Sequence, residues 1–251
     1  MKRIKLIIYF IIAIIIFSGC YTHSYYNNFN TNIPLLKNKN ELQCYAGGVG
    51  NVKKLEGYNF GLAYAFNDKF AFGTDYCYSQ HFEDDGRNGQ KGHYFDISLG
   101  YFDSFGSIGK INKPFIYDIY FGYGKDFQHH VYSHGVDGYI IYSDLKMDKL
   151  FARTSIGFSI EVIDLAFSLG TSRLSYYSTK TNLTFGDDLD LINQIAANKV
   201  FYLFEPTLTF QFGGDHFKIR NQITFIYPDK HDIIGYNFVF NLGLIYLFNK
   251  R

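Results

Sequence analysis

The chain has 251 residues, with 24 Lys and Arg against 23 Asp and Glu. This even balance does not suggest nucleic acid or a strongly acidic partner. Phe and Tyr number 27 and 23, Gly 24 and Pro only 4, while Trp is absent. Enrichment in aromatic residues and glycine with little proline predicts many strands and tight contacts. A chain of this length is sufficient for one sizeable domain.

The first segment has the features of a secretory signal peptide. Lys2, Arg3 and Lys5 form a positive start, and 6–17 (LIIYFIIAIIIF) is an unbroken apolar run. As a helix this run would rise about 18 Å, which is short of the roughly 30 Å hydrocarbon core of a bilayer. We therefore predict a signal peptide over 1–19 rather than a spanning helix.

The apolar run ends in Ser18-Gly19-Cys20. This ending resembles the bacterial lipobox, which implies cleavage before Cys20 and acylation of its thiol and new amino group. Two or three acyl chains anchor a protein stably, where one would be marginal. The alternative is an ordinary secretory signal with a chance cysteine. Residues 20–40 then form a lipidated tether with a contact point at Ile33–Leu36.

Residues 41–251 form a single domain with sustained alternation of period two. In 58–66 one face carries the apolar residues and the other carries Asn59, Gly61, Ala63 and Ala65. Such alternation over nine to thirteen residues exceeds an average soluble strand of about five or six. It matches the roughly ten-residue tilted strand of a membrane barrel. The ten predicted strands are 41–49, 57–67, 69–80, 93–103, 114–126, 148–160, 162–174, 200–213, 216–228 and 234–248.

The connections support an all-β fold, a single antiparallel up-and-down barrel of about ten strands of the outer-membrane type. Three connections are tight, at 67–68, 161–162 and 214–215. Three are long: 81–92, 127–147 and 175–199. Short turns at one end and long loops at the other are typical of outer-membrane barrels. The medium loop expected at 104–113 on the short side is an exception.

The residue types on the two faces indicate which one meets lipid. A soluble, lipocalin-like barrel would direct the apolar row inward and a charged row into water. Here the second row is mainly Gly, Ala, Ser and Asn with isolated charges, which suits a crowded lumen better than a solvent face. The isolated charges are Asp75, Asp96, Asp118, Arg153, Asp164, Glu205, Lys218 and Arg220. We predict that the aromatic rows face acyl chains.

Charges inside a narrow barrel must pair. We expect Arg153, Lys218 and Arg220 to form a network with carboxylates, namely Asp96, Asp118, Asp164 and Glu205. The network would be a plug that specifies the fold; the alternative is a gated polar path.

Other candidate sites lie in the expected long loops. His129, His130 and His134 could hold a transition metal, and acidic clusters at 83–85 and 187–190 could chelate calcium. Solvated side chains are the favoured interpretation of both. A short amphipathic helix over 187–198 could cap the mouth. No hydrolase, P-loop, zinc or dinucleotide motif occurs, so no cofactor or metal is expected. Cys44 and Cys77 could pair or remain free.

Several stretches resemble a family of lipid-anchored β-barrel proteins from Bacteroidota: IPLLKNKNELQCYAGGVG, FGLAYAFNDKFAFGTDYCYS, YDIYFGYGKDF and YLFEPTLTFQFG. The resemblance covers most of the chain after the tether and implies no catalytic residues. Surface-exported lipoproteins of that phylum resemble one another in acidic residues after the cysteine. Residues 21–24 (YTHS) lack them, which favours an anchor in the periplasmic leaflet.

These observations support three functional hypotheses. The first is an outer-membrane lipoprotein with a structural or binding role, whose partners are membrane lipid and a protein contacted through the long loops. The second is a rim-site hydrolase that uses Asp and His residues: His81, His129, His130 and His134 with Asp84, Asp85 and Asp187. The third is a lipid-tethered soluble barrel that binds an apolar ligand. Nucleic acid is not an expected partner.

Overall fold

The computed structural model describes residues 33–50, 55–82, 89–109, 111–133, 140–160, 162–183, 187–230 and 237–248. The predicted signal peptide 1–19 and the lipidation site Cys20 lie outside the described residues. So does the first part of the tether, up to residue 32.

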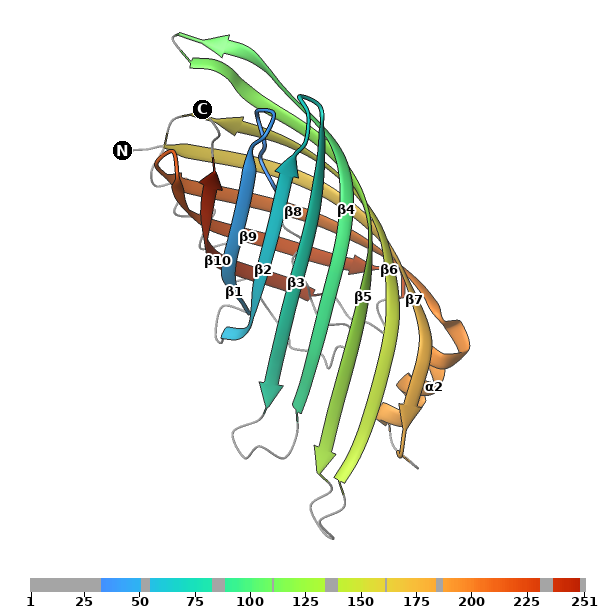
Figure 1. Ribbon diagram of the computed structural model, residues 1–251. Helices are drawn as coiled ribbons and strands as arrows, with labels where there is room; N and C mark the ends of the chain where they lie inside the picture. Colours follow the sequence, from blue (N-terminus) through green and yellow to red (C-terminus); the bar gives the residue numbers. More distant parts are fainter. Residues whose placement is uncertain are drawn as a thin grey trace, which may run out of the picture.

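Ten antiparallel strands close into a barrel in the order β1-β10-β9-β8-β7-β6-β5-β4-β3-β2 (Figure 1). Every strand pairs with its neighbours in sequence, and β1 closes on β10, so the predicted up-and-down barrel is confirmed. The strands are β1 (Leu42–Gly50), β2 (Leu55–Ala65), β3 (Phe70–Phe82), β4 (Gly89–Ile108), β5 (Ile111–Ser133), β6 (Ile140–Ser159), β7 (Ile163–Thr181), β8 (Val200–Gly213), β9 (Phe217–Pro228) and β10 (Asn237–Phe248). Helix α2 (Asp187–Asn198) precedes β8, as the sequence predicted.

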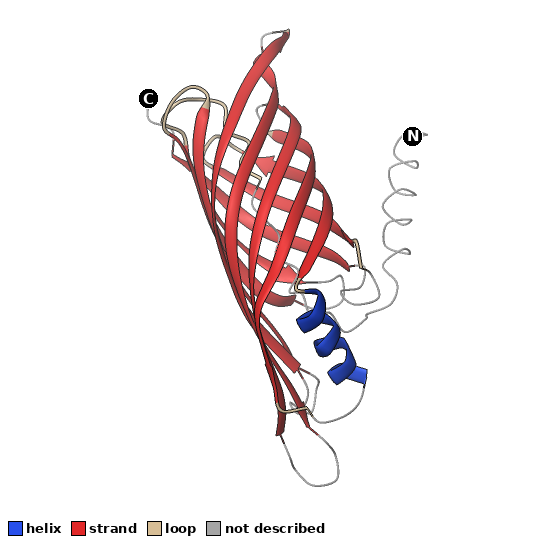
Figure 2. Cartoon of the chain, turned by 90° about the vertical axis from the view of Figure 1, so that its right-hand side faces the viewer, coloured by secondary structure: helices blue, strands red, loops and turns tan. Residues whose placement is uncertain are grey.

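We call the two ends of the barrel near and far. At the near end β1 begins, β10 ends, and short connections join β2 to β3, β6 to β7 and β8 to β9. At the far end β5, β6 and β7 extend beyond the other strands, and α2 lies beside them (Figures 1 and 2). Among the described helices, none has the length and apolar character to cross a bilayer.

Two of the predicted loops are largely strand. The expected loop 104–113 is wrong, because β4 continues to Ile108 and β5 restarts at Ile111. The expected loop 127–147 is shorter, since β5 and β6 stay paired as far as Ser133 and Ile140. Part of 175–199 likewise belongs to β7 and α2. Backbone ladder bonds continue where the apolar alternation stops, so side-chain pattern alone ended these strands too early.

The outer wall is apolar and aromatic. Phe121 is 63% exposed, Leu244 59% and Ile156 58%, although all three are large apolar side chains. On β8 the outward row runs from Tyr202 to Phe212. At about 3.4 Å per residue this row measures about 34 Å, or about 26 Å along the axis at a tilt of about 40°. That height equals the apolar band of about 25 Å on membrane barrels.

Residues of the tether enter the near end of the barrel. Ile33 and Leu36 are fully buried, and Leu35 is 5% exposed. Ile33 and Leu35 pack with the inward-facing Ile116 and Ala166, and Leu36 packs in a second cluster that includes Phe102 and Tyr120. The contact point expected at Ile33–Leu36 is therefore an apolar plug inside the lumen.

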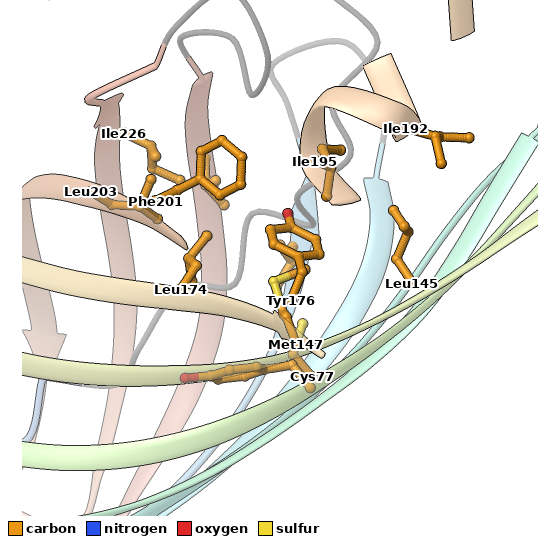
Figure 3. Close-up of a cluster of buried hydrophobic side chains, with 13 residues drawn as sticks. Cys77, Leu145, Met147, Leu174, Tyr176, Ile192, Ile195, Phe201, Leu203 and Ile226 are labelled. Carbon is orange, nitrogen blue, oxygen red and sulfur yellow. The ribbon is translucent and has the colours of Figure 1, made fainter. Parts of the chain in front are cut away.

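The far end is closed by a second apolar layer. Ile192 and Ile195 of α2 are 3% and 0% exposed and belong to a cluster with inward-facing residues from eight strands. Figure 3 shows both isoleucines on the side of α2 turned toward the inner wall, near Leu145 and Tyr176. Helix α2 thus covers apolar side chains that would otherwise meet water at the far end.

Glycines in the strands make room for lumen rings. The ring of Tyr120 lies over Gly100, its cross-strand partner, where an added Cβ would overlap the ring. Phe151 lies over Gly122 in the same way. Rings laid flat on a neighbouring strand fill a narrow lumen without displacing the wall. This packing explains why glycine and aromatic residues are enriched together.

Candidate functional site

The polar layer of the lumen lies between the two apolar layers. All seven residues of the expected charge network direct their side chains into it, and none is more than 9% exposed. They are Asp96, Asp118, Arg153, Asp164, Glu205, Lys218 and Arg220. A buried charge is costly unless it is paired or hydrogen-bonded, so the contacts of each decide what this layer can do.

Nearest the plug, Asp164 of β7 and Lys218 of β9 form an ion pair. The hydroxyl of Ser159 also donates to the Asp164 carboxylate. These groups border a polar cavity of about 200 Å³ that Lys37 and Glu41 also line. The structure thus brings together one pair of the expected network, across β8.

Glu41 fixes the turn that carries the plug. Its Oε2 accepts hydrogen bonds from the backbone N–H groups of Lys37 and Asn38, at 3.0 and 3.1 Å. Burial raises the pKa of the Glu41 carboxyl above its ordinary value, although these two backbone donors oppose the shift. Burial likewise lowers the pKa of Lys37. In both cases burial disfavours the charged form, because it removes water from around the ionised group.

Deeper in the lumen, Glu205 of β8 pairs with Lys149 of β6, a residue that the sequence analysis missed. Lys149 Nζ lies 2.8 Å from Glu205 Oε1, and the Ser172 hydroxyl donates to the other carboxylate oxygen. Lys149 is only 1% exposed. The sequence could have placed Lys149 in the lumen, because it alternates along β6 with Phe151 and Arg153, and alternate residues of a strand share a face.

The two arginines contact aromatic rings. The guanidinium carbon of Arg220 lies 3.7 Å from the ring centroid of Tyr45, and that of Arg153 lies 5.2 Å from Tyr120. Such cation–π contacts contribute about 2 kcal/mol when water is excluded. The charge of Arg153 also acts on Asp118 and Asp96. The pairings therefore differ from a simple set of Arg–Asp bridges.

Like charges also meet within this layer. Asp75 and Asp96 are directly opposite on β3 and β4. Carboxylates in that arrangement repel each other, and the charges of Lys149 and Arg153 act on Asp96 to offset the repulsion. The layer is thus a cross-linked polar core whose ion pairs join strands two apart around the barrel, β6 to β8 and β7 to β9.

His129 and His130, the two described histidines of the metal site considered from the sequence, do not share a site. His129 faces outward, with Nδ1 2.6 Å from Asp144 Oδ1, whereas His130 faces inward, with Nε2 3.2 Å from Gln128 Oε1. Consecutive strand residues point to opposite faces, so these two cannot bind one ion. His134 and residues 83–85 lie outside the described residues. Within the described ranges, no three His, Cys, Asp or Glu side chains are placed to hold a metal.

The same geometry bears on the rim-site hydrolase. Of its expected residues, only His129 and His130 have described side chains, and they lie on opposite sides of the wall. The side chains of His81 and Asp187, and residues 84, 85 and 134, are outside the described part. On the inner face, Gln128 Nε2 donates to Asp126 Oδ2 at 2.6 Å. His129 contacts the carboxylate of Asp144 and His130 contacts the amide of Gln128, and neither contact joins a nucleophile to a base.

Both cysteines of the barrel are free. Cys77 is buried in the far-end apolar layer, while Cys44 belongs to the outward row of β1. The wall of the barrel separates the two sulfur atoms, so the pairing left open by the sequence does not form.

No family model and no curated protein matches this chain. Solved structures with a similar fold include the N-terminal β-barrel domain of OprF from Pseudomonas aeruginosa. That match has a TM-score of 0.34 and 9% identity, over 84% of this chain and 98% of that one. The outer membrane protease OmpT from Escherichia coli gives a TM-score of 0.43 and 10% identity, over 84% and 94%. An outer membrane channel from Pseudomonas putida F1 gives 0.37 and 10%, over 83% and 94%. At these low identities and scores, the likeness concerns the barrel fold alone.

Proposed function

We propose that this protein is an outer-membrane β-barrel lipoprotein, anchored through Cys20, closed to solutes, and acting as a structural or binding protein at its far end. The observation that supports the proposal most is the distribution of side chains across the wall. Large apolar and aromatic residues are exposed on the outside, whereas Asp96, Asp118 and Arg220 are completely buried inside. This distribution of side chains is stable when the outer wall is surrounded by the hydrocarbon of a bilayer.

A soluble, ligand-carrying barrel fits less well. Such a barrel needs an apolar interior and a polar exterior, and the middle of this lumen is filled with charged and hydroxyl side chains. The closed sheet of this protein also leaves no unpaired strand edge, as a hydrocarbon environment requires.

Extraction distinguishes the membrane barrel from the soluble, ligand-carrying barrel. Cys20→Ser removes the acylation site, and the variant is expected to remain in the membrane until detergent is added. Release of that variant by carbonate or salt would contradict membrane insertion.

Lipidation at Cys20 has its own test. Mass spectrometry of the N-terminal peptide is expected to show cleavage before Cys20 and an added diacylglyceryl group, which Cys20→Ser would lack. An unmodified peptide that begins elsewhere would contradict the anchor while leaving the barrel unaffected.

The three layers of the lumen support a closed pore. The plug, the ion-paired core and the cap by α2 succeed one another along the axis. Single-channel recording in planar bilayers is therefore expected to show no steady large conductance. A stable open pore would contradict the closed lumen.

A binding role would be carried by the far end, where β4 to β7 extend past the apolar band. Their outward side chains there include charged ones, Lys91, Lys125, Lys146 and Asp144, among exposed rings such as Phe127 and Tyr142. A mixed charged and aromatic wall suits a protein surface. The test is proximity crosslinking in intact outer membranes from Lys125 and Lys146, compared with crosslinking from Lys69 at the near end. Recovery of the same proteins from both ends would contradict recognition by the far end.

A further inference from the structure

The outer wall carries a hollow of about 730 Å³ over β5 to β9, on the side that faces away from the lumen. One row of paired residues crosses it: Phe121, Ala152, Thr171, Phe204 and Tyr227. Ala152 and Thr171 are small, and the other three are large. The hollow is therefore a trough, with Ala152 and Thr171 as its floor and aromatic rings as its sides.

A cation stands at the far end of this trough. Arg173 follows Thr171 on the outward face of β7 and is directly opposite Leu150 and Tyr202. Its side chain is exposed, and it takes part in none of the ion pairs found among the described residues. Asp229 lines the same hollow; its Oδ1 accepts a hydrogen bond from the Tyr202 N–H at 2.9 Å, and it forms no ion pair with Arg173 among those of the described residues.

The height of Arg173 on the wall identifies the kind of ligand. Arg173 is paired with Tyr202, which ends the apolar row of β8 at the far end. From Arg173 toward the near end, the trough continues over Thr171 and Ala152. At the edge of the apolar band, a guanidinium reaches the headgroup region, where lipid phosphates lie. Arginine binds phosphate with parallel N–H donors. A lipid would therefore place its phosphate at Arg173 and one acyl chain in the trough.

We propose that this trough is a binding site for a phosphate-bearing lipid of the leaflet at the far end of the barrel. The inference rests on the proposed membrane insertion. The size of the hollow agrees with it, since ligand sites enclose roughly 300–1,000 Å³. In the bound state, one acyl chain packs between the rings of Phe121 and Phe204, in place of the disordered acyl chains of the bilayer. The lipid phosphate also pairs with the Arg173 guanidinium, which is otherwise solvated.

Native mass spectrometry of the detergent-solubilised full-length protein tests the site. The probes are dimyristoyl phosphatidic acid and dimyristoylglycerol, which share their chains and differ in the phosphate. The protein is expected to bind the phosphatidic acid about tenfold more tightly, in keeping with one charge-assisted interaction. Arg173→Gln removes that preference, and Ala152→Phe, which fills the trough, weakens binding of both lipids.

The control is Ala46→Phe, which adds the same ring at an outward alanine of β1, between Leu244 and Phe60, away from the trough. It is expected to bind both lipids as the natural chain does. Equal effects of Ala46→Phe and Ala152→Phe would overturn the proposal, as would a phosphate preference that survives in Arg173→Gln. Displacement of the phosphatidic acid by an equal concentration of inorganic phosphate would also overturn it.

Vesicle flotation separates this inference from the proposed function. A chain that does not float with phospholipid vesicles would overturn both. A chain that floats and shows no preference for the phosphate-bearing lipid would overturn the trough site alone.

Discussion

A single charge on the outer wall distinguishes hydrocarbon from water around this barrel. Leu208 lies midway between Tyr202 and Phe212 on the outward row of β8 and is 44% exposed. Leu208→Arg therefore places a guanidinium at mid-depth of the proposed apolar band. On membrane barrels, Arg at the midplane costs about 2–4 kcal/mol. At about 1.4 kcal/mol per factor of ten, the folded-to-unfolded ratio falls about 30- to 700-fold.

The matched variant is Tyr202→Arg at the edge of the same row. Near the interface the cost of Arg falls to about 0–1 kcal/mol. Both variants are measured by guanidinium chloride unfolding in phospholipid vesicles, with the unboiled gel shift as a check that the barrel has formed. On a water-exposed wall, either substitution would change stability by about 0.5 kcal/mol or less. Equal and small costs for the two variants would therefore refute the reasoning.

Three further predictions concern the interior. Lys149→Met leaves Glu205 buried without its cation and is expected to cost about 3–5 kcal/mol in unfolding free energy; Lys149→Met with Glu205→Gln should recover most of it, and no recovery would contradict the pair. Because burial raises the pKa of Glu41, folding takes up a proton there. Stability should then fall as pH rises from about 4.5, the ordinary pKa of the group, through the raised pKa, and Glu41→Gln should flatten that dependence in unfolding titrations; a dependence that survives in Glu41→Gln would contradict this assignment. Ile195→Ala should cost about 2–5 kcal/mol in the docking of α2 and speed hydrogen exchange there, while bilayer recordings stay closed because the plug remains; a pore that opens would contradict independent closure at the two ends.

The fold could be predicted from the sequence because the residue types on each strand face indicate whether that face meets lipid or the lumen. Tyr58, Phe60 and Tyr64 are exposed, while Asn59 and Ala63 between them are buried, as period two with rings outward predicts. Helix α2 was accessible for a similar reason, since Ile192 and Ile195 lie on one helical face.

The register of the strands and their lengths could not be predicted from the sequence. The partner of Glu205 depends on how far β6 is shifted relative to β8, and side-chain type does not encode that shift. The ends of β5 and β6 were missed because polar residues on both faces mask the alternation, while the backbone ladder continues. For the same reason His129 and His130 looked like loop neighbours, although a strand sends them to opposite faces.

The most direct test of the account asks what surrounds the outer rings. The chain contains no tryptophan, so a single introduced indole reports alone. Phe167 is outward on β7 and 48% exposed, whereas Tyr120 is fully buried in the lumen. In vesicles whose acyl chains carry bromine, Phe167→Trp is expected to be strongly quenched and Tyr120→Trp to be spared. Quenching of Tyr120→Trp with sparing of Phe167→Trp, or sparing of both, would contradict a wall that faces hydrocarbon.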